Sequence, residues 1–398
     1  MKRAVGLYLG VVQFFFAATW IVYVIFLPQL AAQVGIPKTA VAWILMLDQL
    51  VFVVADYATG VATDRAAKVV GRVGIAVLVA TLVSCGAFLA LPFVAPGGSA
   101  GVFIALTMLW AVTSSALRAP PLALVGRYAA RPAQPMLLAF TMLGLGVASA
   151  IQPYLGLTLR GVDPRLPFAI SSLALALVTV GMVVAERMLQ RDAGSAAPAI
   201  AAAAPAEPTP LFIASALLAA LAFQVHVFID SGPLYVRLAG ASALPTLLPV
   251  FWIGFNVAMF PFSLAARRWS APRVMGVAAI GAAAGALGVN AAATLPVLVA
   301  MQLVAGAAWA GVLVAAFAWA LARGGGGRAG TFAGALSSVL AAATLMRMAS
   351  ISAGWPKAPG FSSALVWWPC VGWLAASAVV LALRRMSRGR AGAPGAPT

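Results

Sequence analysis

Charged residues are scarce in this 398-residue sequence, and acidic residues are the scarcest of them. Lys, Arg, Asp and Glu make up 8% of the chain, whereas an average soluble domain contains about one-quarter. Hydrophobic residues make up 63%. Because a soluble core of this length needs far less apolar surface, the composition excludes an ordinary soluble protein and indicates an all-α membrane protein.

Cysteine and histidine are almost absent, with two cysteines and one histidine. Cys85 and Cys370 lie in apolar stretches and have neither metal-ligand nor redox spacing. His226 and Asp230 are one helical turn apart, but no nucleophile or nucleophile-elbow motif accompanies them. We therefore expect no metal, no cofactor and no enzymatic activity.

The formal charge is +17, which alone would suggest nucleic acid as a partner. The arginines, however, occur in short clusters between apolar stretches, and no basic stripe is interleaved with aromatic residues. This distribution is typical of membrane topology determinants, so we expect a lipid bilayer and no nucleic acid as the partner.

Membrane-crossing segments need about 20 apolar residues in a helix. The first apolar run, 5–32, is longer than the roughly 7–15 residues of a signal-peptide core, so we interpret it as an uncleaved span. The sequence predicts twelve spans, at 6–31, 39–62, 73–95, 101–125, 136–158, 167–186, 211–233, 244–265, 274–293, 297–321, 330–352 and 361–383.

Basic residues favour one side of this topology. With the N-terminus in the cytoplasm, eighteen of the 25 Lys and Arg residues fall in cytoplasmic segments, five in external segments and two within spans. The positive-inside rule therefore predicts that both termini are cytoplasmic.

The longest break between spans, 187–210, is rich in Ala and Pro and has no apolar periodicity. We interpret it as a cytoplasmic linker between a six-helix bundle at 1–186 and another at 211–383, with a basic tail at 384–398. The first and seventh spans both end in Pro-x6-Gly, at 28–35 and 233–240, as a 6+6 repeat predicts.

The loop after the second span reads Gly60-Val-Ala-Thr-Asp64-Arg65-Ala-Ala-Lys68. At these residues the chain resembles the major facilitator superfamily (MFS), whose loop signature is Gly-x-x-x-Asp-Arg-x-Gly-Arg-Arg. Ala67 replaces the second Gly. The resemblance implies an MFS fold, transport activity and a gating role for Gly60, Asp64, Arg65 and Lys68. The alternative is that Asp64 and Arg65 are solvated loop charges.

Two further features of the family are partly present. Arg118 occupies the place of an arginine that is often found in the family's fourth span, and Pro153 and Gly156 retain part of an antiporter element of the fifth span. The resemblance therefore implies transport, while the departures weaken the implication of antiport.

Six ionisable residues lie inside the predicted spans, where a charge costs several kcal/mol and marks a functional candidate. Depth along the helices predicts two ion pairs, Asp56 with Arg118 and Asp230 with Arg347. We expect structural or gating roles for these pairs. Substrate contact is the alternative, and an unpaired Arg118 would indicate an anionic substrate.

Asp48, in the second span, is left without an obvious cation. A carboxyl group in a low-dielectric cavity favours its protonated form, a property that a proton carrier needs. Asp48 is therefore the candidate for proton coupling. The alternative is a structural carboxyl hydrogen-bonded by a neighbour such as Gln49.

Polar and aromatic residues at mid-span depth are candidates for a central substrate cavity, although aromatic residues in membrane helices often only pack. The candidates are Gln13, Thr19, Trp20, Tyr23, Gln49, His226, Trp252 and Asn256. A packed neutral histidine is the alternative for His226.

These observations predict two six-helix bundles that expose a midplane site alternately to either side. We expect a secondary transporter in a bacterial cytoplasmic (inner) membrane, exporting a small organic solute in exchange for protons. The alternatives are proton-linked uptake of a small organic anion through Arg118 or Arg347, and a non-transporting sensor or assembly partner. The sequence does not determine the oligomeric state, for which a monomer is our expectation.

Overall fold

The computed structural model describes residues 2–69, 73–194 and 209–391, and within this part of the chain all regular structure is helical. Twelve helical segments are long and apolar enough to cross a membrane. Each overlaps one of the twelve predicted spans, so the number and order of the spans are confirmed.

The first half of the chain contributes six of these segments. Its helices are α1 (Lys2–Gln33), α2 (Lys38–Val69), α3 (Val73–Val94), α4 (Ala100–Ser114), α5 (Ala119–Tyr128), α6 (Gln134–Thr158), α7 (Arg165–Val180) and α8 (Met182–Gly194), with short 3₁₀ turns η1 (Ser115–Leu117) and η2 (Arg131–Ala133). The fourth span thus combines α4, η1 and α5, and the sixth combines α7 and α8.

The second half contributes the other six. Its elements are α9 (Thr209–Val225), the π-helical η3 (His226–Asp230), α10 (Ser231–Ala239), η4 (Ala241–Ala243), α11 (Leu244–Leu247), α12 (Pro249–Arg268), α13 (Ala271–Ala291), α14 (Leu295–Arg323), α15 (Ala329–Ser352), η5 (Trp355–Lys357) and α16 (Phe361–Ala391).

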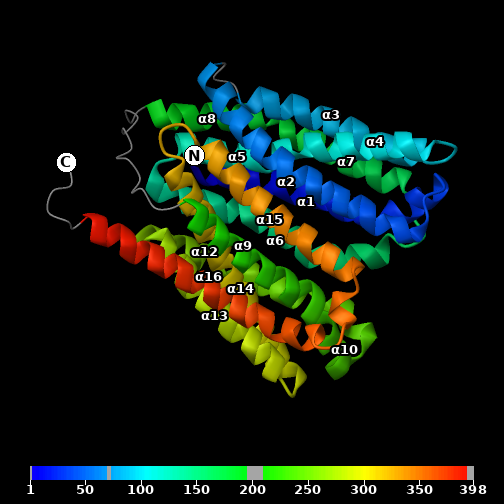
Figure 1. Ribbon diagram of the computed structural model, residues 1–398. Helices are drawn as coiled ribbons and strands as arrows, with labels where there is room; N and C mark the ends of the chain where they lie inside the picture. Colours follow the sequence, from blue (N-terminus) through cyan, green and yellow to red (C-terminus); the bar gives the residue numbers. More distant parts are fainter. Residues whose placement is uncertain (1, 70–72, 195–208, 392–398) are drawn as a thin grey trace.

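The helices of each half pack mainly against one another. Helix α1 packs on α6 and α3 on α7 in the first half, while α13 packs on α14 and α16 on α9 in the second. Contact between the halves comes chiefly from α2 with α15 and from α6 with α12. Figure 1 shows the beginning of α1 and the ends of α8 and α16 at one end of the molecule, called here the terminal end; the other is the distal end.

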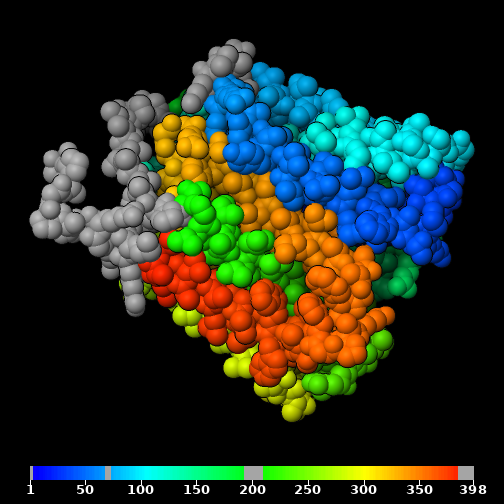
Figure 2. All heavy atoms as spheres, viewed as in Figure 1, coloured from blue at the N-terminus to red at the C-terminus, as the bar shows by residue number. Residues whose placement is uncertain are grey.

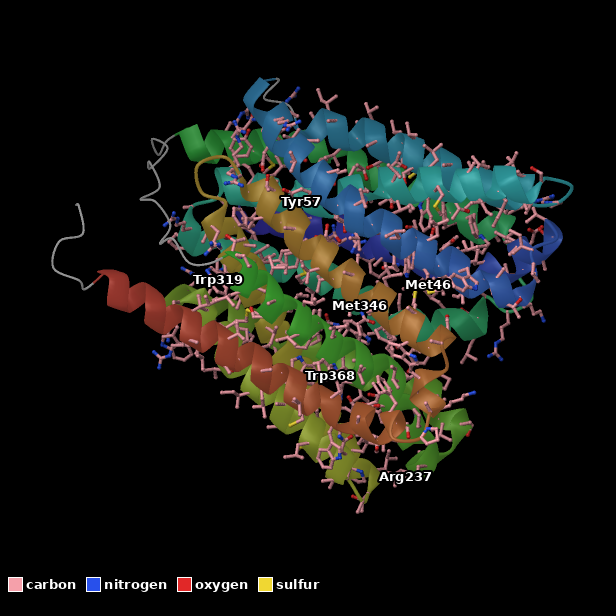
Figure 3. The ribbon with its side chains drawn as sticks, in the orientation of Figure 1. Met46, Tyr57, Arg237, Trp319, Met346 and Trp368 are labelled. Atoms are coloured by element: carbon pink, nitrogen blue, oxygen red, sulfur yellow. The ribbon has the colours of Figure 1, made fainter. Side chains whose placement is uncertain are left out.

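The outer surface of the bundle is apolar along its length. In Figure 3 the side chains that project from the outer helices are mostly carbon, while nitrogen atoms gather towards the two ends. Figure 2 shows α15 between the blue first half and the α9 and α16 helices of the second half. An apolar band between charged ends matches the hydrocarbon region of a bilayer.

Two predicted boundaries differ from the structure. Helix α8 continues to Gly194, so the first residues of the predicted 187–210 linker are helical. Arg187, Gln190 and Arg191 are good helix formers, and Leu189 between them is buried, so the helix extends beyond the apolar segment. Residues 195–208 lie outside the described part of the chain. Likewise, α16 extends into the predicted tail as far as Ala391.

Candidate functional site

Asp48 lies on α2 inside the first half, and its side chain is fully buried. The hydroxyl of Tyr23, on α1, donates a hydrogen bond to Asp48 Oδ2 at 2.7 Å. The other carboxyl oxygen, Oδ1, is buried without a hydrogen-bond partner among the described residues. The neighbour that holds Asp48 is therefore Tyr23 and not Gln49, and one oxygen remains available to a proton.

Aromatic rings surround this pair. The ring of Tyr23 lies 4.6 Å from that of Trp110, and Trp20 stacks on Trp110 at 5.8 Å between centroids. Phe88 extends the cluster, 5.2 Å from Trp110. Apart from the Tyr23 hydroxyl, no described group donates a hydrogen bond to Asp48, so its carboxyl lies in largely apolar surroundings.

The fourth span is interrupted where it passes the centre of the first half. Pro120 and Pro121 lack backbone N–H groups and end α4 as a regular helix, leaving a 3₁₀ turn before α5. The carbonyl of Leu117, which would accept from residue 121 in a continuous helix, instead accepts a hydrogen bond of 2.5 Å from Gln13 Nε2. Gln13 thus stabilises the break through its side-chain amide.

Arg118 is the residue at this break, and it forms the predicted ion pair. Its Nε lies 3.2 Å from Oδ2 of Asp56, whose side chain is fully buried while that of Arg118 is 22% exposed. The guanidinium also lies over the ring of Phe52, 4.7 Å from its centroid. The break between α4 and α5 therefore supplies a cation beside a carboxylate that would otherwise be buried alone.

The seventh span carries a second irregularity, the π-helical turn that begins at His226. His226 Nε2 lies 3.1 Å from Gln302 Oε1, Gln302 Nε2 donates to Ser231 Oγ at 2.7 Å, and Ser231 Oγ donates to the carbonyl of His226 at 2.6 Å. All three side chains are buried. This closed network matches the alternative of a packed neutral histidine, with Nε2 as the donor.

The predicted ion pair between Asp230 and Arg347 is wrong for this conformation. Between two described residues the structure contains one ion pair, that of Asp56 with Arg118. Arg347 Nε instead donates to Gln224 Oε1 at 2.8 Å, and its guanidinium lies 4.6 Å from the ring centroid of Phe228. A π turn changes which side chains of a helix face a neighbour, and here α15 meets Gln224 and Phe228.

Asp230 ends the π-helical turn and is half-buried. Its Oδ2 is buried without a hydrogen-bond partner among the described residues. The second half therefore holds a carboxyl group and a guanidinium group that do not neutralise one another.

At the terminal end the two halves meet backbone to backbone. A Cβ added to Gly60 of α2 would lie 2.2 Å from the carbonyl oxygen of Gly330, and one added to Gly334 would lie 2.4 Å from the carbonyl oxygen of Asp56. Only glycine permits this approach of α2 to α15.

Asp64 closes the same contact. Its carboxylate accepts from the backbone N–H of Gly330 at 2.8 Å, and from the N–H and hydroxyl of Thr331, both at 2.7 Å. It thus caps the N-terminus of α15 from the other half. Asp64 is therefore not a merely solvated charge, whereas Arg65 is exposed and the side chain of Lys68 lies outside the described residues.

The predicted cavity residues do not converge on one site. Gln13, Trp20 and Tyr23 belong to the interior of the first half, and Thr19 bonds to the carbonyl of Phe16 in its own helix. His226 and Trp252 pack inside the second half, 5.9 and 5.5 Å from the ring of Phe251.

Gln49 and Asn256 are the remaining predicted cavity residues. Gln49 is buried. Asn256 lies between the halves, where Gly146 of α6 leaves room for its side chain, and its Oδ1 is buried without a hydrogen-bond partner among the described residues.

Sequence reasoning missed several residues. Gln302 and Ser231 hold His226, and Gln224 holds Arg347 while donating to Thr344. A side-chain amide in the middle of an apolar span was a visible signal for Gln302 and Gln224. Glu186 was also missed: its carboxylate accepts from the N–H groups of residues 73 and 74 and so caps α3.

The family model of the Major Facilitator Superfamily matches residues 9–346. The chain belongs to this superfamily. It is therefore a multi-pass membrane transporter of the secondary type and not an enzyme, and the predicted family and fold class are confirmed. No curated protein matches the sequence well enough to count as a relative.

Solved structures share the fold at low sequence identity. A bacterial homologue of the iron transporter ferroportin in an outward-facing state matches with a TM-score of 0.72 and 15% identity, over 96% of this chain and 99% of that one. The human organic anion transporter MFSD10 matches at 0.66 and 15%, over 97% and 99%. The E. coli fucose:proton symporter FucP matches at 0.64 and 14%, over 96% and 97%.

Proposed function

We propose that this transporter couples the movement of a small organic solute to protons, with Asp48 as the proton-binding group. The observation that supports the proposal is the environment of the carboxyl group, which is fully buried beside aromatic rings. Among the described residues it has no cation within ion-pair distance, and its Oδ1 has no hydrogen-bond partner. Protonation supplies the missing hydrogen and removes a charge from apolar surroundings.

Tyr23 gives this group two stable states. When Asp48 is charged, the Tyr23 hydroxyl stabilises it with a hydrogen bond of 2.7 Å, and when Asp48 is protonated the same hydroxyl keeps the side chain in place. Asp56 differs because Arg118 neutralises it without a proton. We therefore assign proton exchange to Asp48 and a structural role to the Asp56–Arg118 pair.

We further propose that transport is export, by exchange of solute for protons across a bacterial cytoplasmic membrane, with both termini on the cytoplasmic side. The direction is supported by Pro153 and Gly156, which retain part of the family's antiporter element in α6. The orientation is supported by the excess of basic residues in the predicted cytoplasmic segments.

The contact between α2 and α15 supports a gating role for Gly60 and Asp64. It closes the terminal end in this conformation. Opening that end requires the Gly60 and Gly330 backbones to separate and Asp64 to release α15. A closed terminal end is the arrangement expected of a carrier whose site opens at the distal end.

A second candidate function, proton-linked uptake of a small organic anion, is supported by Arg347. Its guanidinium is held by the neutral Gln224 and the Phe228 ring, with no carboxylate within ion-pair distance among the described residues. A solute with a carboxylate next to an apolar group would suit such a cation beside an exposed aromatic ring. MFSD10, of similar fold, is an organic anion transporter.

The test of proton coupling is proton release in weak buffer from detergent-purified protein. We would add tetraphenylphosphonium, an amphipathic cation, and benzoate, an amphipathic carboxylate. Wild type should release protons on binding tetraphenylphosphonium if the two exchange, or take up protons on binding benzoate in symport, and Asp48→Asn should do neither while still folding. Asp163→Asn, which changes an exposed loop carboxylate, is the matched control and should behave as wild type. Release or uptake of protons by Asp48→Asn equal to that of wild type would refute the assignment.

Proteoliposomes distinguish the two candidate functions. An acidic interior drives a solute inwards by proton exchange and outwards by proton symport, so the direction of movement separates export from uptake. In the uptake model Arg347→Gln abolishes benzoate binding in a folded protein, whereas in the export model it leaves tetraphenylphosphonium binding intact. Solute movement that ignores the pH gradient would contradict both.

A further inference from the structure

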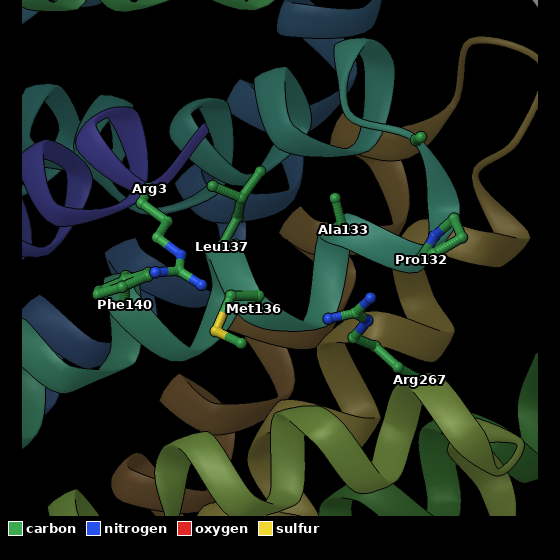
Figure 4. Close-up of a pocket in the computed structure, with 8 residues that line it drawn as sticks. Arg3, Pro132, Ala133, Met136, Leu137, Phe140 and Arg267 are labelled. Atoms are coloured by element: carbon green, nitrogen blue, oxygen red, sulfur yellow. The ribbon is translucent and has the colours of Figure 1, made fainter. Parts of the chain in front are cut away.

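A cleft lies at the terminal end beside the contact of α6 with α12, and it is lined by residues of both halves. It has a volume of about 270 Å³. Figure 4 shows Arg3 of α1 and Arg267 of α12 on opposite sides of Met136. The two arginines therefore come from different halves of the transporter and reach the same cleft.

The lining of this cleft is positive and has no counter-charge. Its described residues include Arg3 and Arg267 but no carboxylate, and neither arginine has an ion-pair partner among the described residues. The cleft also lies at the beginning of α6, the positive end of that helix's dipole. The positive charge of this cleft therefore favours an anionic ligand that contacts both arginines.

One wall of the cleft is apolar. Met136, Leu137 and Phe140 lie along one stretch of α6. Behind them the halves are in contact, since the Phe140 ring lies 4.9 Å from that of Phe260 of α12. A ligand with an anionic group and a hydrocarbon chain matches such a site more fully than a bare ion does.

We propose that this cleft binds an anionic phospholipid, whose phosphate lies between Arg3 and Arg267 and whose acyl chain follows Met136, Leu137 and Phe140. The position favours a lipid, because both arginines lie at the ends of membrane-crossing segments, Arg3–Gln33 and Ala241–Arg268, where spans reach the level of lipid headgroups. A lipid bound here links α1 and α6 of one half to α12 of the other.

The consequence for the transporter is conformational. A phosphate held by both arginines stabilises the arrangement in which the terminal end is closed, because Arg3 and Arg267 must separate when the halves move apart there. This inference does not depend on Asp48 or on the solute, so it stands or falls independently of the proposed coupling.

The experiment measures lipid binding by native mass spectrometry of the full-length protein in dodecyl maltoside. Phosphatidylglycerol is compared with phosphatidylcholine of identical acyl chains. Wild type should retain phosphatidylglycerol preferentially. The Arg3→Gln/Arg267→Gln double variant should bind it about thirtyfold more weakly, since each basic group near an anionic lipid surface contributes about 1 kcal/mol of binding free energy.

The matched control is Arg268→Gln/Arg273→Gln, which removes two exposed positive charges from the same end of the second half outside the cleft lining. It should retain wild-type binding. Equal loss in this control, or full binding in the Arg3→Gln/Arg267→Gln variant, would refute the site.

Two further measurements complete the test, competition by inorganic phosphate and a lysine variant. Inorganic phosphate that competes fully with phosphatidylglycerol at equal concentration would reassign the cleft to a free anion and refute the lipid. If the Gln variant fails to fold, Arg3→Lys/Arg267→Lys replaces it. We expect weaker phosphatidylglycerol binding there too, because lysine lacks the planar fork of arginine, and unchanged binding would count against the proposal.

Discussion

The two halves of this transporter stabilise their buried polar groups in different ways. In the first half, carboxyl groups have dedicated partners, Arg118 for Asp56 and Tyr23 for Asp48. In the second half, Gln302 holds the histidine and Gln224 holds the arginine, so neutral amides replace opposite charges.

From this difference we infer different roles for the polar groups of the two halves. A buried pair of opposite charges is expected to stay together throughout the transport cycle, because separating its members leaves each charge buried and uncompensated. An amide that holds a cation leaves its net charge in place, so the cation still attracts an anion. The first half thus contains a charge pair with a structural role, Asp56 with Arg118, and a separate candidate proton site at Asp48. The second half contains a cation, Arg347, that is suited to contact with a solute.

Among the variants that test this comparison, Arg118→Gln should have the largest effect on stability. It leaves Asp56 buried without its cation, and we expect it to lower the free energy of unfolding by about 3–5 kcal/mol. Adding Asp56→Asn should restore part of the loss, because it removes the uncompensated charge. Thermal melting in detergent measures both variants. If Arg118→Gln melts at the same temperature as wild type, the Asp56–Arg118 pair does not stabilise the fold.

Gly60→Ala tests the place where the halves meet. Its Cβ would lie 2.2 Å from the carbonyl oxygen of Gly330, so the closed terminal end should lose about 3 kcal/mol relative to the open one. We expect faster labelling of cysteines placed beneath this contact. Gly86→Ala, on α3 where an added Cβ meets nothing within 4 Å, is the control. Equal labelling in the two variants would contradict the prediction.

Gln302→Leu tests the neutral network of the second half. It leaves His226 Nε2 without a buried hydrogen-bond partner and removes the donor to Ser231 Oγ, which we expect to cost about 2 kcal/mol of stability. Chemical unfolding measures the loss. Asn290→Leu is the comparison, because its amide bonds at an exposed position to the carbonyl of Val366 and should cost less. A larger cost for Asn290→Leu would show that the His226 network contributes little.

Asp64→Asn has the smallest expected effect. The amide retains one acceptor oxygen but loses the charge and part of the bonding to Gly330 and Thr331, at a cost of about 1 kcal/mol to the closed terminal end. The cysteine-labelling assay used for Gly60 should show a smaller change in the same direction. A decrease in labelling would mean that Asp64 does not hold the end closed.

The sequence was sufficient for the twelve spans, because length and hydropathy determine which segments cross a bilayer. It also predicted the Asp56–Arg118 pair, since depth along the second and fourth spans brings those residues to one level. The same reasoning failed for Asp230 and Arg347, because the π-helical turn at His226 has no simple signature in apolar periodicity.

The hydrogen-bond partners of buried side chains were harder to predict than the depth of a residue in the membrane. Tyr23 was expected to line a cavity, yet it donates to Asp48, and the facing sides of α1 and α2 follow only from their packing. Gln13 was given the same role, but it satisfies the carbonyl released by Pro121. A proline pair in a span predicts that a carbonyl is released, while the donor that satisfies it depends on tertiary structure.

The glycine contact between α2 and α15 also has a consequence for the speed of conformational change. Helices that interlock through large side chains must disengage each of them before they part. Gly60, Gly330 and Gly334 present bare backbone to the opposite helix and have no side chains to disengage. At this contact opening must break the hydrogen bonds of Asp64, so we expect this carboxylate to slow the separation of α2 from α15.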